Sequence, residues 1–305
     1  MRKLPGRSWI PVLWSVRNKH LVVESMKQIH VNDIIETVER LCIQACTTLG
    51  DDWWQAMEKA VELEESPLGK SLLGILRENA ELAASTGEPI CQDTGLAVVF
   101  LEIGQEVSIT GGNLYDAINE GVRCGYVNGY LRKSVVSDPL IRENTGDNTP
   151  AIIHTEIVPG SDLKITVAPK GAGSENSSGL KMLKPADGQE GVIKFVLEVV
   201  EAAGPNACPP IVVGVGIGGN LEKSALLAKK ALLRPLGERH PKPHIAKLEE
   251  ELLRRVNSTG IGPQGLGGRI TALDVHVEVY PTHIASLPVA VNIQCHASRH
   301  AEAVL

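Results

Sequence analysis

The segment PIVVGVGIGG at residues 210–219 constrains the fold more than any other stretch of the chain. A short apolar run that is rich in valine and isoleucine and bounded by turn-forming residues is typical of a buried strand. Predicted helices flank it at 187–203, 220–233 and 242–257, and further strands are predicted at 269–280 and 284–294. This part of the chain is therefore predicted to form sheet covered by helices.

The first third of the chain is predicted to be mostly helical, because apolar residues recur there at helical spacing. The predicted helices before residue 140 lie at 31–49, 53–64, 68–85 and 113–132. Strands are predicted at 96–104, 151–158 and 162–169, the last two pairing around the turn Pro159-Gly160-Ser161, and 169–179 is predicted to be a loop. Since helices and strands do not alternate strictly, we expect an α+β fold: a helical N-terminal region followed by mixed β-sheets with flanking helices.

Three glycines of the central segment form a nucleotide-like motif. Gly214, Gly216 and Gly219 give G-x-G-x-x-G after a predicted strand and before a helix. A dinucleotide fold needs a second strand after that helix, ending in an acidic residue that binds ribose. Here RPLGERHPKPH and another charged helix follow. We therefore favour close backbone approach or tight packing as the role of these glycines, with nucleotide binding as the weaker alternative.

Composition and charge exclude some classes of partner. The 305 residues carry a formal net charge of -6 and 3% aromatic residues, which argues against a nucleic-acid partner. No apolar run approaches the ~20 residues of a membrane span, so no membrane is expected. The six cysteines are irregularly spaced and form no disulfide framework, which favours a reducing cytoplasm.

Residues 1–25 differ from the rest of the chain, because they are basic and contain WIPVLW. Pro5 and Pro11 break this apolar stretch and no small-residue cleavage site follows, which disfavours a secretory signal. We expect 1–25 to be a disordered leader, or to precede a true start at Met26. Residues 26–305 are expected to form the catalytic domain.

The cysteines occupy two kinds of setting. Cys42 and Cys46 lie one turn apart beside the apolar face of a predicted helix, and we interpret them as small core residues. Cys91 in PICQDTG, Cys208 in GPNACPP and Cys295 in NIQCHAS lie at the ends of predicted elements, among turn-forming or polar residues. Thiolates at loop tips are candidate ligands of a metal or cluster.

Three cysteines from three separate loops suit an iron–sulfur cluster held where the loops meet, whereas the lack of a C-x-x-C pair disfavours a zinc ribbon. Three thiolates leave one iron of a four-iron cluster open, and an open iron can act as a Lewis acid toward a hydroxyl and a carboxylate. Such an iron is also exposed to oxidants, so activity should be oxygen-sensitive. Cys124 could be a fourth ligand, but its helical setting favours packing.

Six motifs occur in a characteristic order: CQDTG (91–95), RENTGDNTPA (142–151), KGAGSEN (170–176), NACPP (206–210), GIGG (216–219) and YPTHIASLPVAVNIQCHASRHA (280–301). Together they resemble the iron–sulfur hydro-lyases of the class I fumarate hydratase and L-tartrate dehydratase family, and more narrowly the alpha subunit of the two-subunit form. The resemblance implies that Cys91, Cys208 and Cys295 hold a [4Fe-4S] cluster whose fourth iron binds substrate.

The resemblance implies roles for five more residues. Gln92 and Asp93 would lie beside the open iron, where Asp93 accepts a hydrogen bond and shuttles a proton; alternatively, Asp93 only caps its turn. Arg132 would bind a substrate carboxylate bidentately, its alternative being a surface arginine at a helix end. Gly173 would offer backbone N–H groups near the substrate. His283 matches the active-site histidine of the family.

The resemblance also implies a partner. In single-chain relatives the CHASRHA segment is followed by a domain that supplies basic residues and a proton-abstracting base, whereas this sequence ends at Leu305. We therefore expect a separate beta subunit, an interfacial active site and an α2β2 assembly. The expected reaction is reversible hydration of fumarate to L-malate.

Two alternatives to fumarate hydration remain open. The first is dehydration of L-tartrate, a substrate that differs from L-malate by one hydroxyl. The second, from another class, is a non-catalytic iron–sulfur sensor, which does not account for Asp93, Arg132 and His283 in the same motifs.

Overall fold

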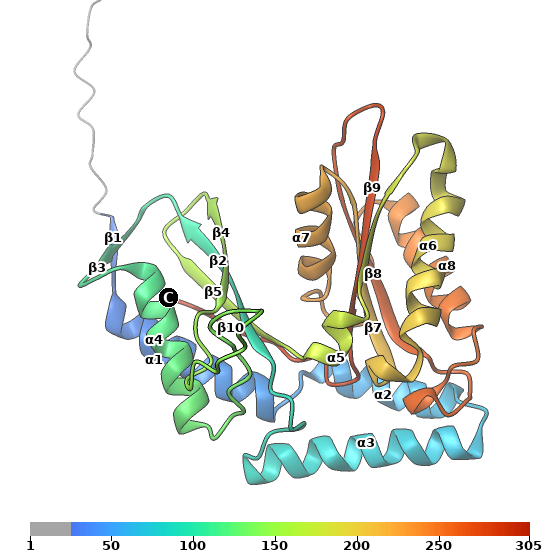
Figure 1. Ribbon diagram of the computed structural model, residues 1–305, viewed down its shortest axis with the longest axis horizontal. Helices are drawn as coiled ribbons and strands as arrows, with labels where there is room; N and C mark the ends of the chain where they lie inside the picture. Colours follow the sequence, from blue (N-terminus) through green and yellow to red (C-terminus); the bar gives the residue numbers. More distant parts are fainter. Residues whose placement is uncertain (1–25) are drawn as a thin grey trace, which may run out of the picture.

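Two four-stranded sheets, each within its own lobe, and a small two-stranded sheet of β1 and β3 make up the β-structure in a computed structural model that describes residues 26–305 (Figure 1). The expectation for residues 1–25 lies outside the described residues. The helices are α1 (Val31–Thr47), α2 (Asp51–Leu63), α3 (Pro67–Thr86), α4 (Leu114–Asn128), α5 (Ala172–Asn176), α6 (Gly188–Ala203), α7 (Leu221–Ala231) and α8 (Pro243–Asn257). The strands are β1 (Lys27–His30), β2 (Leu96–Gly104), β3 (Val107–Thr110), β4 (Ile152–Val158), β5 (Leu163–Lys170), β6 (Gly179–Leu183), β7 (Ile211–Gly218), β8 (Ala272–Tyr280), β9 (Leu287–Gln294) and β10 (Ala301–Val304). The fold is α+β, as predicted.

The first sheet has the strand order β10-β5-β2-β4 and is built around β2. The sequence of β2, LAVVFLEIG, is apolar along nearly its whole length, so the strand takes a central position where both faces are covered. It pairs antiparallel with β5 and parallel with β4. The predicted pairing of the two strands around Pro159-Gly160-Ser161 is therefore wrong, because β2 lies between them. β4 is left at the edge, where Ile157 is 70% exposed.

Helices α1 and α4 pack together against this sheet and enclose the first core. Cys42 and Cys46 are fully buried in that core, which confirms the prediction that they are small core residues. On α4, a Cβ at Gly121 would lie 2.6 Å from the Val38 side chain, and one at Gly125 would lie 2.7 Å from Cys42. Glycine at these two positions therefore allows the helices to lie in close contact.

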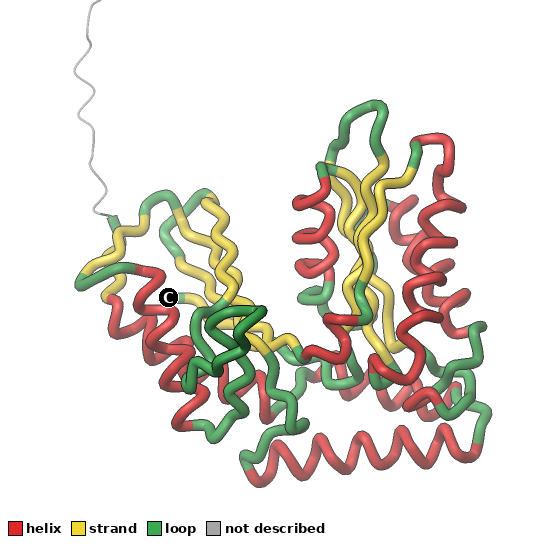
Figure 2. The backbone as a smooth tube through the Cα atoms, in the orientation of Figure 1, coloured by secondary structure: helices red, strands yellow, loops and turns green. Residues whose placement is uncertain are grey.

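The second sheet has the order β6-β9-β7-β8, and its helices lie on both faces (Figure 2). α6 and α8 share a core with one face, and α7 packs against β7 on the other. A Cβ at Gly214 or Gly216 would collide with the main-chain oxygens of Ala228 and Ser224 on α7. Tight packing, the role favoured for the G-x-G-x-x-G glycines, is thus confirmed for these two.

The long helix α3 runs along one end of both lobes (Figure 1) and leads into the loop that carries Cys91. The Ser66 side chain caps its start by accepting a hydrogen bond from the Gly69 amide, and Pro67 occupies its first turn. Gly87, with a φ of 74°, ends it. Among residues 26–305, no helix is both long enough and apolar enough to cross a membrane.

Four short strands were not predicted from the sequence: β1, β3, β6 and β10. Each has only four or five residues, most of them exposed or half-buried, so the alternation of apolar and polar residues that predicts a strand is missing. The predicted loop at 169–179 also contains α5.

Candidate active site

Cys91 lies in the loop between α3 and β2, which is tied down on both sides of the thiol. The amide of Ile90 donates a hydrogen bond to the Cys46 carbonyl at 3.0 Å. Thr94 is buried, and its hydroxyl accepts a hydrogen bond from the Arg132 amide at 2.9 Å. The Cys91 thiol is left partly exposed between these two anchors.

Cys208 and Cys295 lie in two further loops that contact each other. Cys208 follows the short 3-10 helix η2 (Gly204–Ala207), has a left-handed backbone with a φ of 52°, and is exposed. Cys295 directly follows β9. The amide of His296 donates a hydrogen bond to the Cys208 carbonyl at 3.3 Å, so the two loops are adjacent.

The three thiols are close enough to influence one another. Partial burial of the thiol within an otherwise exposed residue, followed by the charges of Cys295 and Cys91, raises the pKa of Cys208. Within residues 26–305 no three His, Cys, Asp or Glu side chains gather closely enough to hold a single metal ion. Cys91, Cys208 and Cys295 would hold an iron–sulfur cluster, which is a larger group than one ion and is bound by cysteine thiolates. Three interacting thiols at three loop ends therefore fit a thiolate-bound cluster.

The other three cysteines lie on helices rather than at loop ends. Burial raises the pKa of Cys46 to about 11, so its thiol stays protonated at neutral pH. Cys42 is buried one turn earlier on α1. Cys124 lies on α4, where its sulfur contacts the Glu120 and Arg123 side chains.

The carboxylate of Asp93 is fixed by two main-chain amides. Oδ1 accepts a hydrogen bond from Gly95 at 3.1 Å, so Asp93 does cap its turn, and Oδ2 accepts one from Ala172 at 2.9 Å. Gly95 has a φ of 75°, and a Cβ there would lie 2.6 Å from the carbonyl carbon of Lys170, so only glycine permits this approach. These contacts fix Asp93 against the KGAGSEN segment.

Gln92 in the Cys91 loop is exposed, and so is Arg132 in the segment after α4 that binds this loop. The Gln92 side-chain oxygen accepts a weak hydrogen bond from the Cys91 thiol at 3.5 Å. Arg132 is tied to Thr94 through its main chain, which leaves its guanidinium at the exposed surface. Gly173 lies on α5, where a Cβ would come within 3.1 Å of the Asn206 carbonyl oxygen. Asn206 lies two residues before Cys208, so Gly173 is adjacent to the Cys208 loop. The structure thus brings Gln92, Asp93, Arg132 and Gly173 to the three cysteine loops.

The KGAGSEN segment also holds an ion cluster that sequence reasoning missed. Lys229 of α7 donates hydrogen bonds to both carboxylate oxygens of Glu175, and Lys170 of β5 lies 3.2 Å from the same carboxylate. The side-chain amide of Asn292 donates to Glu175 at 2.9 Å. Two charged residues within a segment of small residues were the signal available in the sequence.

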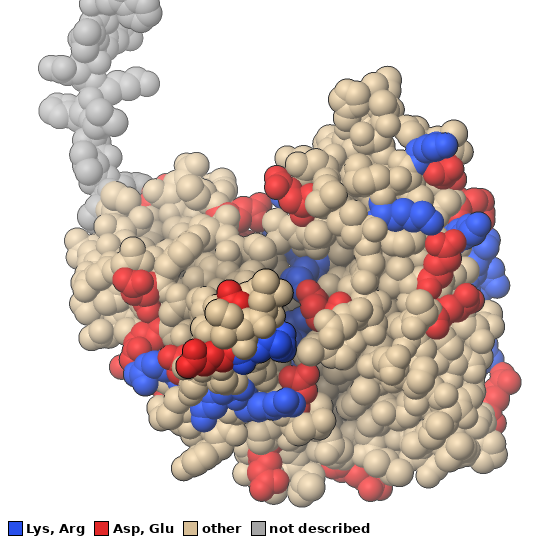
Figure 3. Space-filling view, viewed as in Figure 1, with Lys and Arg blue, Asp and Glu red and all other residues tan. Residues whose placement is uncertain are grey.

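A pocket of about 360 Å³ opens beside this ion cluster, and its lining includes Asp93, Ser134, Lys170, Glu175 and Lys229. The space-filling view shows basic and acidic atoms gathered in the hollow between the two lobes (Figure 3). The pocket therefore offers charged groups beside Asp93 to a small polar ligand.

His283 lies apart from the other predicted site residues. It occupies the exposed loop between β8 and β9, where its Nδ1 accepts a hydrogen bond from the Ala285 amide at 3.1 Å. Cys295 follows the opposite end of β9 (Figure 1), and a strand of that length spans roughly 25 Å. Within one chain, His283 and the three cysteines therefore do not share a site.

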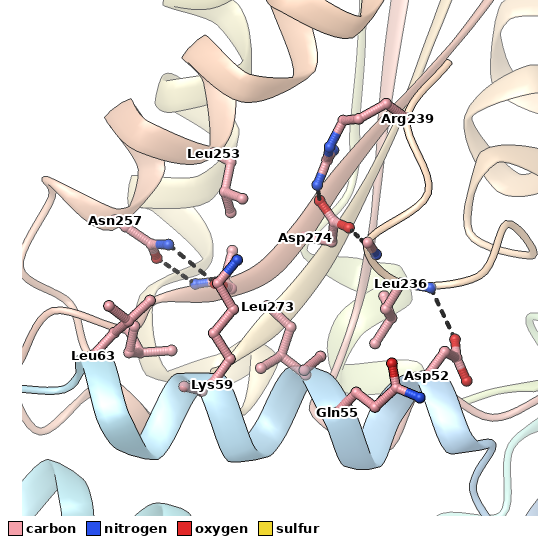
Figure 4. Close-up of a pocket in the computed structure, with 15 residues that line it drawn as sticks. Asp52, Gln55, Lys59, Leu63, Leu236, Arg239, Leu253, Asn257, Leu273 and Asp274 are labelled. Atoms are coloured by element: carbon pink, nitrogen blue, oxygen red, sulfur yellow. Dashed lines mark hydrogen bonds and ion pairs between the residues drawn. The ribbon is translucent and has the colours of Figure 1, made fainter. Parts of the chain in front are cut away.

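A second pocket, of about 300 Å³, lies between α2 and the second sheet (Figure 4). Several of its polar groups are paired with neighbouring residues: Asp52 accepts a hydrogen bond from the Leu236 amide, and Asp274 pairs with Arg239. Although burial would raise it, the pKa of Asp274 is lowered to about 2, mainly by the hydrogen bond to His276. These contacts tie α2 and β8 to the loop that follows α7, and they engage Asp52, Arg239 and Asp274 of the pocket lining.

The family description "Fumarate hydratase (Fumerase)" matches residues 35–304 of this sequence. The chain belongs to the fumarate hydratase family. A "Putative L(+)-tartrate dehydratase subunit alpha" of Methanocaldococcus jannaschii is 47% identical over 274 residues, which cover 88% of this chain and 96% of the relative. Proteins named L(+)-tartrate dehydratase subunit alpha in Escherichia coli (strain K12) and Shigella sonnei (strain Ss046) are 35% identical over 282 residues, covering 92% of this chain and 93% of each relative.

The match extends from α1 to β10 of this fumarate hydratase family member. It confirms the family predicted from the six motifs. Hydro-lyase chemistry is common to the family description and to the names of the relatives, and this confirms the predicted enzyme class.

Proposed function

We propose that this chain is the alpha subunit of an iron–sulfur hydro-lyase that adds water reversibly to fumarate to give L-malate. The meeting of three partly exposed thiols from three loops carries the proposal. In it, Cys91, Cys208 and Cys295 hold a [4Fe-4S] cluster. When bound, such a cluster supplies an open iron that acts as a Lewis acid toward the substrate hydroxyl and a carboxylate.

The polar groups of the chain bind and orient the dicarboxylate. Arg132, exposed at the Cys91 loop, binds one substrate carboxylate through two parallel hydrogen bonds. The side-chain amide of Gln92 and the main-chain amide of Gly173 donate to the remaining carboxylate oxygens. The Asp93 carboxylate retains lone pairs beyond the two amides it already binds, so it accepts a hydrogen bond from the hydroxyl and holds its proton.

A beta subunit completes the proposed enzyme. This part rests on the relatives, which are named alpha subunits. We assign to the beta subunit the base that takes the C3 proton of L-malate, and we expect an α2β2 assembly with the site at the interface. The free thiols of the chain suit a reducing cytoplasm.

His283 enters this proposal as a catalytic residue that acts across subunits. Because it lies at the far end of β9 from Cys295, it can reach a cluster only if that cluster is bound by another copy of the chain. An exposed loop on the second lobe is able to make such a contact.

Dehydration of L-tartrate to oxaloacetate is the second candidate, favoured by the names of the relatives. L-tartrate differs from L-malate by one additional hydroxyl, and a site that hydrogen-bonds this hydroxyl discriminates strongly between the two.

The deciding experiment purifies the chain anaerobically with its beta subunit and measures kcat/KM for L-malate, fumarate and L-tartrate. We expect L-malate to exceed L-tartrate by about tenfold or more. The reverse ratio would replace fumarate by tartrate as the substrate. A loaded cluster without turnover of any of the three would favour the iron–sulfur sensor.

A further inference from the structure

Arg299 is a buried cation behind the three cysteine loops. It lies four residues after Cys295, is only 2% exposed, and its Nη1 donates a hydrogen bond to the main-chain carbonyl of Asp93 at 2.7 Å. Within residues 26–305 its Nε has no hydrogen-bond partner, and no carboxylate forms an ion pair with it. The Asp93 carboxylate, which lies nearby, is engaged by the amides of Gly95 and Ala172 instead.

A water molecule can accept hydrogen bonds from this guanidinium, but it cannot balance its positive charge. Arg299 lines a cavity of about 20 Å³ together with Gln294, whose side-chain oxygen also lacks a partner. That volume holds one water molecule, which could bridge the two groups. An arginine cannot shed its proton, and burying a cation without an anion costs several kcal/mol. The site therefore calls for a negative charge.

The groups that can supply this charge are thiols. Cys295 lies four residues before Arg299, and Cys91 lies two residues before Asp93, whose main-chain carbonyl Arg299 binds. Cys46 is buried, and with a pKa of about 11 it stays neutral. Cys91 and Cys295 remain, and both are proposed cluster ligands. Thiolates that ligate iron are deprotonated at neutral pH and carry the negative charge that the chain lacks.

We propose that Arg299 is a positioning residue that serves as the buried counter-charge of the thiolate-bound cluster and ties the Cys295 loop to the Cys91 loop. The inference rests on the cluster proposed above. A fixed cation beside the cluster stabilises its more negative, reduced form, so it raises the reduction potential. Its hydrogen bond to Asp93 also holds two of the three ligand loops in register.

The test uses the full chain reconstituted anaerobically with ferrous iron and sulfide, as parent, Arg299→Gln and Arg299→Lys. Arg239→Gln is the matched control, because Arg239 belongs to a separate partly buried ion cluster with Asp274. We expect Arg299→Gln to move the reduction potential to a more negative value and to lose iron to a chelator about tenfold faster. Arg299→Lys should restore most of the parent reduction potential but less of the resistance to iron loss. Arg239→Gln should leave the reduction potential unchanged.

Thermal unfolding of the same proteins separates a counter-charge from a merely structural arginine. Without the cluster, Arg299 is an uncompensated buried cation, and this cost offsets its hydrogen bond to Asp93. Arg299→Gln should therefore leave the Tm of the apo-chain unchanged or raise it. With the cluster, the same substitution should lower the Tm. Equal losses of Tm in both forms, or an unchanged potential in a folded Arg299→Gln, would overturn the inference. A parent chain that binds no iron or sulfide would instead refute the proposed cluster.

Discussion

Lys229 on α7 donates hydrogen bonds to both carboxylate oxygens of Glu175, at 2.7 and 2.8 Å. Since Lys170 of β5 lies 3.2 Å from the same carboxylate, Glu175 balances one cation from each lobe. Lys170 is buried, and burial lowers its pKa to about 8 even though Glu175 opposes this shift. This ion cluster holds the Gly173 segment against both sheets.

Glu175→Gln should destabilise the apo-chain by about 2 kcal/mol, because it leaves the buried Lys170 without an anion. This loss is smaller than the loss expected when a fully buried ion pair is broken, because 43% of the Glu175 side chain is exposed to solvent. Glu156→Gln is the control: it removes the exposed partner of the adjacent Lys230 and should cost under about 1 kcal/mol. Equal losses in urea unfolding would contradict a special role for Glu175.

Glu175→Gln should also change how the free energy of unfolding depends on pH in the acid range. Burial would raise the pKa of Glu175, but Lys170, Lys229 and Asn292 lower it to about 2. A carboxyl whose pKa is lower in the folded state contributes stability above its unfolded value of 4.5, and this contribution is lost as the pH falls toward 2. The unfolding free energy of Glu175→Gln should therefore fall less steeply than that of the parent over this range. Parallel curves would show that the carboxylate is not stabilised by folding.

Cluster binding should depend on the three loop cysteines alone. Cys91→Ser, Cys208→Ser and Cys295→Ser should each abolish or strongly reduce iron and sulfide content after anaerobic reconstitution. Cys42→Ala is the control, because it removes a buried core sulfur at a cost of about 1 kcal/mol without removing a ligand. If Cys42→Ala lost the cluster and one loop variant kept it, the ligand assignment would fail.

Catalysis should require the beta subunit. The cluster-loaded chain alone lacks the assigned base, which contributes ~10²–10⁴-fold, so its turnover should be at most about one hundredth of that of the complex. Titrating in the beta subunit should restore the rate, with saturation at equimolar chains. Comparable rates with and without it would place the base on this chain.

Complementation tests whether His283 acts across copies. His283→Ala and Cys295→Ser should each be inactive in the complex. Mixing the two variants before assembly should return about a quarter of the parent activity if two copies pair at random. A mixture that stays inactive would contradict action across copies, and full activity of His283→Ala alone would remove it from the mechanism.

Much of the fold could be predicted because its elements carry strong local patterns. Strand 96–104 was predicted with the bounds of β2, and helix 242–257 differs from α8 by one residue. Strand order could not be predicted in the same way, because pairing depends on contacts between distant segments. The insertion of β2 between β4 and β5 is the example.

In the candidate site, too, residues with a local sequence signal could be predicted, whereas contacts between distant segments could not. Cys91, Cys208 and Cys295 could be singled out because turn-forming neighbours surround each of them. The partners of Arg299 and Glu175 could not be predicted, because they lie far away in the sequence: Arg299 binds Asp93 across 206 residues, and Glu175 binds Lys229 across 54. The separation of His283 from Cys295 likewise follows from β9 being extended, which turns a short sequence interval into a long distance.

The glycines of β7 affect more than the sheet to which they belong. Because Gly214 and Gly216 have no side chains, α7 lies directly on β7, and it is from this position that Lys229 reaches Glu175. A methyl group at either glycine would displace the helix outward and take the lysine with it. The geometry of the cleft between the lobes therefore depends on two residues that touch neither cysteine nor substrate, so a mutation inside the second lobe can alter substrate affinity while every proposed ligand stays intact.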